Sequence, residues 1–171
     1  MIANHQIRLA LPNDARSIAE MSRDYIENGL GWSWTEARVL RAIRDKSTNV
    51  AVVHDRGYVL GFGIMAYGDN TAHLVLLGVH KTQRKRGLGA SILLWLEECA
   101  LTAGIERIEV EAREDREAAL RFYRGRGYRE IERLSGYYRG IVNGVRLEKR
   151  CGLNSGAARD MKACIKRGLR S

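Results

Sequence analysis

Three strand-like runs between residues 48 and 79 constrain the fold more than any other part of this sequence. The runs are rich in apolar and β-branched residues, which favour strands. Only two short segments containing glycine, DRG (55–57) and GDN (68–70), separate them, and such segments are typical of hairpin turns. The sequence therefore predicts an antiparallel meander of three strands: TNVAVVHD (48–55), YVLGFGIMAY (58–67) and AHLVLLGV (72–79).

Helical periodicity and turn signals outline the rest of the chain. A short strand at HQIRLAL (5–11) precedes Pro12-Asn13-Asp14, which predicts the start of a helix with an apolar face from Ala15 to Ile26. Ser33 and Glu36 have the spacing of a capping box for a second helix. The remaining elements are predicted as a helix between Gly87 and Gly104, a strand at 105–112, a helix capped by Asp115 and running through Arg126, and strands at about 128–134 and 144–150. Together they predict an α/β fold, a mixed and mostly antiparallel sheet of about seven strands with helices on both faces.

Composition limits the class of protein. The chain has 171 residues, of which 45% are hydrophobic, so we expect one domain, residues 1–151, followed by a basic C-terminal extension, 152–171. No apolar run approaches the roughly 20 residues that span a bilayer, and the first residues lack the apolar core of a signal peptide. We therefore expect a cytoplasmic protein with no membrane partner. The three cysteines show no metal-ligand spacing, so no metal is predicted.

A basic, glycine-containing loop follows the third run of the meander. In HKTQRKRGLGAS (80–91), four basic side chains stand directly before Gly87 and Gly89, and a helical pattern begins after them. The N-terminus of a helix presents unpaired N–H groups and the positive end of its dipole, and glycine lets an anion approach the backbone. This loop and the net charge of +9 predict an anionic ligand, most simply a phosphate.

Two motifs resemble those of the GNAT N-acetyltransferases. Arg84-x-x-Gly87-x-Gly89 is similar to the loop that binds the pyrophosphate of acetyl-CoA in that family. The later segment REAALRFYRGRGYRE resembles the family's helix in which a small residue is followed by a tyrosine and a Gly-aromatic pair, here Ala119, Tyr123, Gly127 and Tyr128. The resemblance covers about residues 5 to 150, and it implies the GNAT fold and acetyl transfer to an amine.

The resemblance implies acetyl-CoA as the cosubstrate, with no metal. Backbone groups near the end of the meander would contact the pantetheine arm and the acetyl oxygen, and the basic loop would surround the pyrophosphate. Arg116 stands where the family usually has asparagine, so one cofactor contact departs from the pattern. The implied cofactor-binding residues are Leu77, Gly78, Val79, Arg84, Lys85, Arg86, Gly87, Leu88, Gly89, Ala90, Arg116 and Ala119.

The resemblance also implies the catalytic groups. Tyr123 stands at the position of the family's catalytic tyrosine, where a phenol that stays protonated at neutral pH can donate its proton to the departing thiolate. Glu111 precedes Tyr123 by twelve residues, the separation of base and acid in the RimI-type N-terminal acetyltransferases of ribosomal proteins. His73 is the competing base, since some histone acetyltransferases carry a glutamate at its position. His5, His54 and His80 show no ligand spacing and are expected at the surface.

The RimI resemblance extends to candidate acceptor-binding residues. Trp34 and the pair Tyr137-Tyr138 match positions that line the substrate side in that subfamily, which favours a peptide or protein N-terminus as acceptor. The final segment NGVRLEKR (143–150) departs from the subfamily's acidic pair and apolar strand.

Alternatives to this function remain open from the sequence. A small-molecule amine could be bound by an acidic pocket, for which Glu20, Glu27, Glu36, Glu109 and Glu111 are candidates. A module that binds acetyl-CoA or nucleic acid without catalysis is the other alternative, because the extension is basic and Met161, Ile165 and Leu169 recur at helical spacing. A homodimer is also compatible with the sequence.

Overall fold

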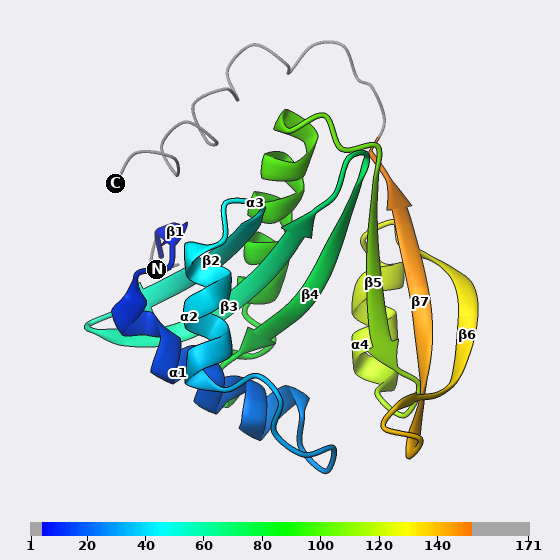
Figure 1. The fold of residues 1–171 in the computed structure, drawn as a ribbon, viewed down its shortest axis with the longest axis horizontal. Helices are drawn as coiled ribbons and strands as arrows, with labels where there is room; N and C mark the ends of the chain where they lie inside the picture. The colour runs from blue at the N-terminus through cyan, green and yellow to red at the C-terminus, as the bar shows by residue number, and fades with distance from the viewer. Residues whose placement is uncertain (1–4, 152–171) are drawn as a thin grey trace.

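The computed structural model describes residues 5–151, and these form a seven-stranded sheet in the order β1-β2-β3-β4-β5-β7-β6 (Figure 1). All neighbouring strands are antiparallel except β4 and β5, which are parallel. The predicted basic extension, 152–171, lies outside the described residues. The elements are β1 (Ile7–Leu9), a 3-10 turn (Pro12–Asp14), α1 (Ala15–Met21), a π-helical turn (Ser22–Ile26), α2 (Glu36–Arg44), β2 (Thr48–Asp55), β3 (Tyr58–Tyr67), β4 (Thr71–Val79), a 3-10 turn (Lys81–Gln83), α3 (Leu88–Thr102), β5 (Arg107–Arg113), α4 (Glu117–Arg124), β6 (Arg129–Tyr138) and β7 (Val142–Arg150).

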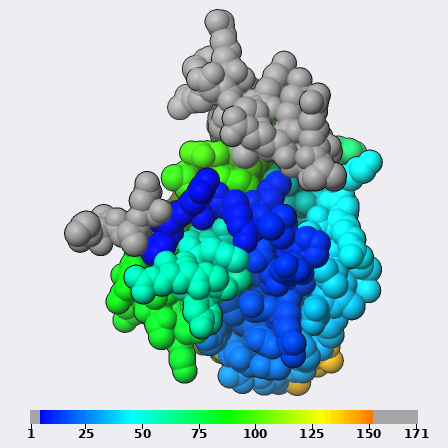
Figure 2. All heavy atoms as spheres, turned by 90° about the vertical axis from the view of Figure 1, so that its left-hand side faces the viewer, coloured from blue at the N-terminus to red at the C-terminus, as the bar shows by residue number. Residues whose placement is uncertain are grey.

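Helices cover both faces of the sheet, as the sequence predicts (Figure 1). Ile18 of α1 and Val39 of α2 belong to a buried cluster on one face, and Leu96 of α3 and Leu120 of α4 belong to the cluster on the other. In Figure 2 the N-terminal part of the chain, in blue and cyan, covers most of the side that faces the viewer. Among residues 5–151, no helix is long and apolar enough to cross a membrane.

Two glycines of β3 let α3 lie close to the sheet. A Cβ atom on Gly61 would stand 2.8 Å from Ile92 Cδ1, and one on Gly63 would stand 2.7 Å from Leu96 Cδ1. Both distances are shorter than real Cβ contacts, so any side chain there would push α3 away from β3. The close packing of α3 against β3 therefore explains the two glycines of the segment GFG (61–63).

The meander is confirmed, but two helix caps differ from the prediction. The N-cap of α2 is Thr35, whose hydroxyl accepts the Arg38 N–H, and the Ser33 hydroxyl instead donates to Glu27. The capping-box spacing was therefore a coincidence. Asp115 does not cap α4 either, because its carboxylate forms an ion pair with Arg113 at 2.8 Å and Arg116 occupies the N-cap position. An arginine in the preceding strand competes for the carboxylate that would otherwise cap the helix.

The C-terminal hairpin is longer than predicted. Strand β6 runs to Tyr138 and β7 starts at Val142, so GYY (136–138) lies at the end of a strand and not in a loop. The α4 helix is shorter than predicted, ending at Arg124. Close glycine contacts explain the tight turn: a Cβ on Gly136 would be 3.3 Å from Gly140 Cα, and the Gly140 N–H donates to Gly136 O at 2.8 Å.

A β-bulge in β4 opens the sheet. Ile64 of β3 pairs with Leu76 while Met65 pairs with Leu74, so Val75 is an extra residue in β4. Val75 and Leu76 consequently both pack on the α1 and α2 side, whereas Leu74 packs on the α3 side. A bulge bends and twists its strand. The pairing of β4 with β5 stops at the same place, at Leu74↔Val110, and the two strands diverge beyond it (Figure 1).

Candidate active site

The diverging strands form the two walls of one large cleft. Its volume is about 1260 Å³, and it is lined from both sides by residues of β4, β5, the basic loop, α4, the α1–α2 connection and the β6–β7 hairpin. Within residues 5–151, no strand pairs with the edge of β4 that faces the cleft beyond Leu74. Alternate backbone N–H and C=O groups from Val75 to Val79 are therefore available to an extended ligand along this edge.

The basic loop is folded as an anion-binding turn at the start of α3. Lys85 and Gly87 both have positive φ, at 61° and 80°, and Gly87 is the N-cap of the helix. Residues in the left-handed conformation turn successive N–H groups toward a common point, and the first N–H groups of a helix lack intrahelical partners. At Gly87 the positive φ explains why glycine is present, since other residues adopt that conformation at a cost. The loop can therefore bind a phosphate through its backbone.

The Arg84 side chain is held by the first half of the chain. Its guanidinium lies 5.1 Å from the centre of the Tyr25 ring, and its Nε donates to Val79 O at 3.4 Å. This arginine thus joins the loop to the π-helical turn that carries Tyr25. Its charge stays at the mouth of the cleft.

Most of the predicted cofactor-binding residues line this cleft. Arg86 is the exception, because it is exposed and does not contribute to the cleft wall. Gly78 has a structural reason to be glycine, because a Cβ there would lie 2.7 Å from Phe62 Cε1. The predicted cofactor-binding residues that line the cleft are Leu77, Gly78, Val79, Arg84, Lys85, Gly87, Leu88, Gly89, Ala90, Arg116 and Ala119.

Tyr123 projects from α4 into the wall of the cleft. Its side chain is 7% exposed and packs edge-to-face against the rings of Phe122 and Tyr128. Burial, with a smaller contribution from Tyr138, raises the pKa of Tyr123 above its ordinary value of 10.0. The phenol therefore keeps its proton throughout the neutral range and can act as a donor.

The two candidate bases, His73 and Glu111, are in direct contact. His73 Nε2 is hydrogen-bonded to Glu111 Oε2, and Arg146 Nε donates to Glu111 Oε1 at 2.9 Å. Arg146 in turn donates to Glu132 at 2.6 Å. These four side chains come from adjacent strands in the order β4, β5, β7 and β6, and Glu111, Arg146 and Glu132 are direct cross-strand neighbours. We call the first three of them, His73, Glu111 and Arg146, the cleft triad.

Glu111 is a poor proton acceptor in this arrangement. Burial raises its pKa, but the hydrogen bonds and charges of His73 and Arg146 outweigh burial and hold the pKa below the ordinary value of 4.5. Only 8% of its side chain is exposed, against 42% of that of His73. Because an ionised carboxylate only accepts hydrogen bonds, neutral His73 carries its proton on Nε2 and has its lone pair on Nδ1. His73 is thus the member of the triad with a free basic atom and access to the cleft.

The predicted acceptor-binding residues also line the cleft. Tyr137 and Tyr138 contact one another edge-to-face at 5.0 Å, and Gly144 makes room for Tyr137, since a Cβ there would be 3.1 Å from Tyr137 Cβ. Trp34 lies in the α1–α2 connection with the Arg38 guanidinium 4.1 Å from the centre of its ring. The three aromatic side chains therefore bound the cleft from the α1–α2 connection and from the end of β6.

The sequence does not predict the roles of two residues in this site: Glu27 is considered there only as a candidate for an acidic pocket, and Arg146 is not considered. Glu27 holds the α1–α2 connection, since its carboxylate accepts the Ser33 N–H at 2.8 Å and the Trp34 N–H at 3.1 Å. Arg146 holds Glu111 from the neighbouring strand. The unusual segment NGVRLEKR signals Arg146, but only the β5–β7 register shows that it faces Glu111.

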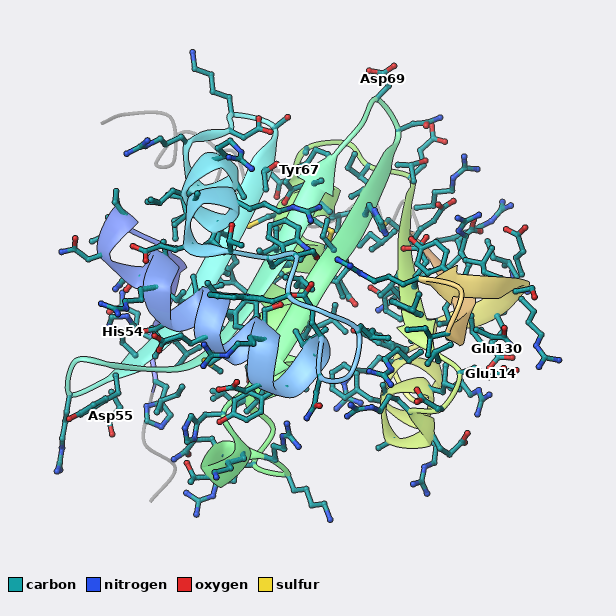
Figure 3. The ribbon with its side chains drawn as sticks, turned by 60° about the horizontal axis from the view of Figure 1, so that its bottom comes forward. His54, Asp55, Tyr67, Asp69, Glu114 and Glu130 are labelled. Atoms are coloured by element: carbon teal, nitrogen blue, oxygen red, sulfur yellow. The ribbon has the colours of Figure 1, made fainter. Side chains whose placement is uncertain are left out.

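A second cluster has the same composition as the cleft triad but lies elsewhere. Asp14 Oδ2 accepts Arg8 Nη1 at 2.8 Å, and Asp14 Oδ1 is 2.7 Å from His54 Nε2. His54 is 28% exposed, so it is not the free surface residue that the sequence predicts. Figure 3 shows His54 beside α1, on the opposite side of the molecule from Glu114, which follows β5. We call Arg8, Asp14 and His54 the β1 triad.

Comparisons with known proteins agree with this architecture. The model of the acetyltransferase (GNAT) family matches residues 15–128. Among solved structures, Ard1 from Thermoplasma volcanium is 22% identical with a TM-score of 0.79, covering 88% of this chain and 99% of that one. PaiA N-acetyltransferase from Thermoplasma acidophilum, in complex with coenzyme A, is 15% identical with a TM-score of 0.75 and coverages of 87% and 100%. The ribosomal-protein-S18-alanine N-acetyltransferase from Escherichia coli is 18% identical with a TM-score of 0.74 and coverages of 88% and 97%.

Proposed function

This chain belongs to the GNAT family of acetyltransferases, and we propose that it transfers the acetyl group of acetyl-CoA to the N-terminal α-amine of a peptide or protein. One observation carries the proposal: a single cleft is lined by the basic loop, Tyr123 and His73 and also by the aromatic side chains of Trp34, Tyr137 and Tyr138. The similarity in fold to the ribosomal-protein-S18-alanine N-acetyltransferase is consistent with such an acceptor.

The cleft fits acetyl-CoA in three respects. The unpaired edge of β4 offers backbone groups to an extended arm, the loop from Arg84 to Ala90 offers N–H groups to a pyrophosphate, and Lys85 and Arg116 add positive charge near them. Acetyl-CoA supplies the activated thioester that the acceptor amine attacks. Among residues 5–151, no group of three or more His, Cys, Asp or Glu side chains is arranged to hold a metal ion.

Tyr123 is the proposed general acid. Its raised pKa keeps the phenol protonated, and a thiolate whose conjugate acid has a pKa near 8.5 is basic enough to accept that proton. No hydrogen bond from Tyr123 Oη to another described residue competes for the proton. The phenol is therefore available to the departing sulfur.

His73 is the proposed base, and Glu111 is the residue that positions it. Both oxygens of Glu111 already accept hydrogen bonds, whereas Nδ1 of His73 is free to take a proton from the amine directly or through water. An α-amine with an ordinary pKa of about 7.7–8.0 is partly neutral at pH 7, so an imidazole suffices. A lysine amine, with a pKa near 10.4, would cost roughly 4 to 5 kcal/mol to deprotonate at pH 7 and would require a stronger base.

A small-molecule amine acceptor receives less support. Of the five glutamates considered for an acidic pocket, only Glu27 and Glu111 line the cleft, and both are already hydrogen-bonded within the chain. Glu20 pairs with Arg16 at the surface. A non-catalytic module that binds nucleic acid would depend on the basic extension, which lies outside the described residues.

The proposal is tested by the release of coenzyme A thiol from acetyl-CoA with a panel of acceptors. The panel contains peptides with free N-termini, the same peptides blocked, lysine peptides, polyamines and aminoglycosides. We expect release only with free N-termini. Release with polyamines or aminoglycosides alone would move the function to small-molecule acetylation, and no release with any acceptor would remove the catalytic proposal.

The role of Tyr123 is tested in the same assay. We expect Tyr123→Phe to lower kcat by about 100-fold or more, because general acid catalysis contributes on that scale, and to leave the affinity for acetyl-CoA within about twofold. Tyr58→Phe is the matched control, since Tyr58 is 74% exposed and does not line the cleft. An unchanged kcat for Tyr123→Phe would exclude the phenol as the proton donor.

A further inference from the structure

The acceptor end of the cleft carries arginines that no carboxylate of the described chain neutralises. We define this end by the residues that line the cleft on the side of α2 and the β6–β7 turn: Trp34, Arg38, Arg41, Tyr137, Tyr138 and Arg139. These residues are distinct from the basic loop, which precedes α3 and faces the cosubstrate in the proposed function.

Two of the arginines lie on one face of α2. Arg38 and Arg41 are three residues apart, and Trp34 and Asp45 continue the same stripe along the cleft. Arg38 stacks on Trp34, which fixes its guanidinium at the cleft wall. Neither arginine forms an ion pair with any residue between 5 and 151.

The third arginine comes from the opposite side. Arg139 is at the tip of the β6–β7 hairpin with a φ of 54°, and its side chain lies against Gly31, where an added Cβ would be 3.3 Å from Nη1. It too lacks an ion pair within the described part of the chain. Arg113, which also lines the cleft, differs because Asp115 and Asn28 O already accept its N–H groups.

The carboxylates of the cleft already accept hydrogen bonds within the chain. Among the described residues, Glu27, Asp45 and Glu111 line it. Glu27 accepts from Ser33 and Trp34, Asp45 accepts from Ser47 and Thr48, and Glu111 accepts from His73 and Arg146. A positively charged acceptor side chain would therefore meet unpaired guanidinium groups, together with carboxylates that already accept hydrogen bonds within the chain.

This charge distribution selects among acceptors. A guanidinium binds a carboxylate through paired N–H donors, and like charges brought together in a cleft repel. The same positive field disfavours the ammonium form of the attacking amine and so lowers its pKa, which helps the chemistry. An acidic acceptor would supply the negative charge that these guanidinium groups lack.

Resting on the proposed function, we propose that the natural acceptor is a peptide N-terminus followed within its first few residues by aspartate or glutamate, bound by Arg38, Arg41 and Arg139. Arg38 and Arg41 are about one helical turn apart, so they can contact side chains at more than one position of an extended peptide.

The test uses three peptides that differ only at residues 2 to 4, which are Asp/Glu, Asn/Gln or Lys/Arg. We expect kcat/KM for the acidic peptide to exceed that of the neutral one by about tenfold and the basic peptide to be the poorest. The preference should shrink as salt is raised from about 0.05 to 0.5 M, because ions screen partly exposed charges. Equal kcat/KM for the three peptides would overturn the inference and leave the proposed function intact.

Charge-reversal variants test which arginines produce the preference for the acidic peptide. Arg41→Glu and Arg139→Glu should each reduce the acidic-over-basic preference at least about fivefold, with little change in the KM for acetyl-CoA. Arg44→Glu is the matched control, since it lies on the same helix, has the same charge and does not line the cleft. A preference that is lost equally in Arg44→Glu would assign it to the net charge of the protein and would contradict the site.

A failure of the proposed function has a different signature. If no peptide is acetylated, the binding of the same three peptides to the protein saturated with coenzyme A is measured by titration calorimetry. If the acidic peptide binds more tightly than the other two and Arg41→Glu weakens that binding, the anion-binding site is supported and the N-terminal acetylation activity is not. Equal or undetectable binding of all three would remove both.

Discussion

The cleft triad and the β1 triad each consist of a carboxylate, a histidine and an arginine, but only the cleft triad borders the cleft. Each has a carboxylate that is almost fully buried, at 8% for Glu111 and 5% for Asp14, and each carboxylate contacts one arginine and one histidine. Burial raises the pKa of both carboxylates, and in both the surrounding donors reverse that effect and hold the pKa below its ordinary value.

The difference lies in what the histidine can reach. His73 lines the cleft, whereas none of the residues of the β1 triad does. Asp14 also accepts the Leu11 N–H at 2.7 Å, so the β1 triad ties β1, the start of α1 and the end of β2 together. A carboxylate, a histidine and an arginine in contact therefore do not identify a catalytic site, and access to a cleft is the feature that separates the two.

Replacing the histidine of each triad by glutamine gives the largest expected difference in kcat between the two triads. We expect His73→Gln to lower kcat by about 100-fold or more, since it removes the base, while His54→Gln leaves kcat within about twofold. The measurement is steady-state thiol release at saturating acetyl-CoA, with melting temperatures recorded for both variants. If His73→Gln retained the wild-type kcat, the proposed base would be excluded and the two triads would both be structural.

Removing the charge of Asp14 in the β1 triad should lower the stability of the fold and leave the activity unchanged. Asp14→Asn leaves Arg8 without its buried partner and weakens the contact with His54, so we expect the free energy of unfolding to fall by about 2–3 kcal/mol. The activity of the folded fraction should be unchanged. Urea unfolding followed by circular dichroism measures the loss, and a change below about 0.5 kcal/mol would contradict the assigned role.

Lowering the pH should reduce the difference in unfolding free energy between the wild type and Asp14→Asn. The pKa of Asp14 is lower in the folded chain than its ordinary value of 3.8, so the carboxylate stabilises the fold fully above that value and loses its contribution as the pH falls through the lowered native pKa. The difference in unfolding free energy between the wild type and Asp14→Asn should thus be constant at pH 5 to 6 and narrow below about pH 4. Unfolding curves from pH 2 to 6 measure it, and a difference that stays constant to pH 2 would show that charge is not its source.

The smallest expected effect concerns Glu132, which has no counterpart in the β1 triad. Its side chain is 52% exposed, and it contacts only the outer side of Arg146. We expect Glu132→Gln to change kcat by less than about threefold and stability by about 0.2–1 kcal/mol, as for other exposed ion pairs. A large loss of activity would show that the position of Glu111 depends on the whole row of charges and would widen the functional site to β6.

The comparison of the triads also shows where sequence patterns suffice. The meander, the loop before α3 and the helix bearing Tyr123 follow from local periodicity and turn residues, and the family match confirms the acetyltransferase assignment. Glu111 and His73 are both recognisable as candidate bases in the sequence. Their contact is not, because it depends on how β4 and β5 are aligned.

Two of the unpredicted parts depend on contacts between distant segments. The Arg146–Glu111 pair requires the register of β7 against β5, and the position of Arg139 requires the hairpin tip to reach Gly31. The misassigned caps have a local origin instead, since Ser33 and Asp115 have capping chemistry but are bound by Glu27 and Arg113, which lie within six residues of them in the sequence. Arg38 and Arg41 were not predicted as site residues, because their position along the cleft depends on how α2 packs on the sheet.

The extra residue at Val75 makes the length of β4 as important as its composition. Side chains alternate along a strand, so deleting one residue after the bulge would exchange the two faces from Leu76 to Val79 and bring a larger side chain than glycine against Phe62. Surface turns can accept insertions and deletions. Between Leu74 and Val79, the same changes would be incompatible with an open cleft, so the fold fixes the length of this segment of β4.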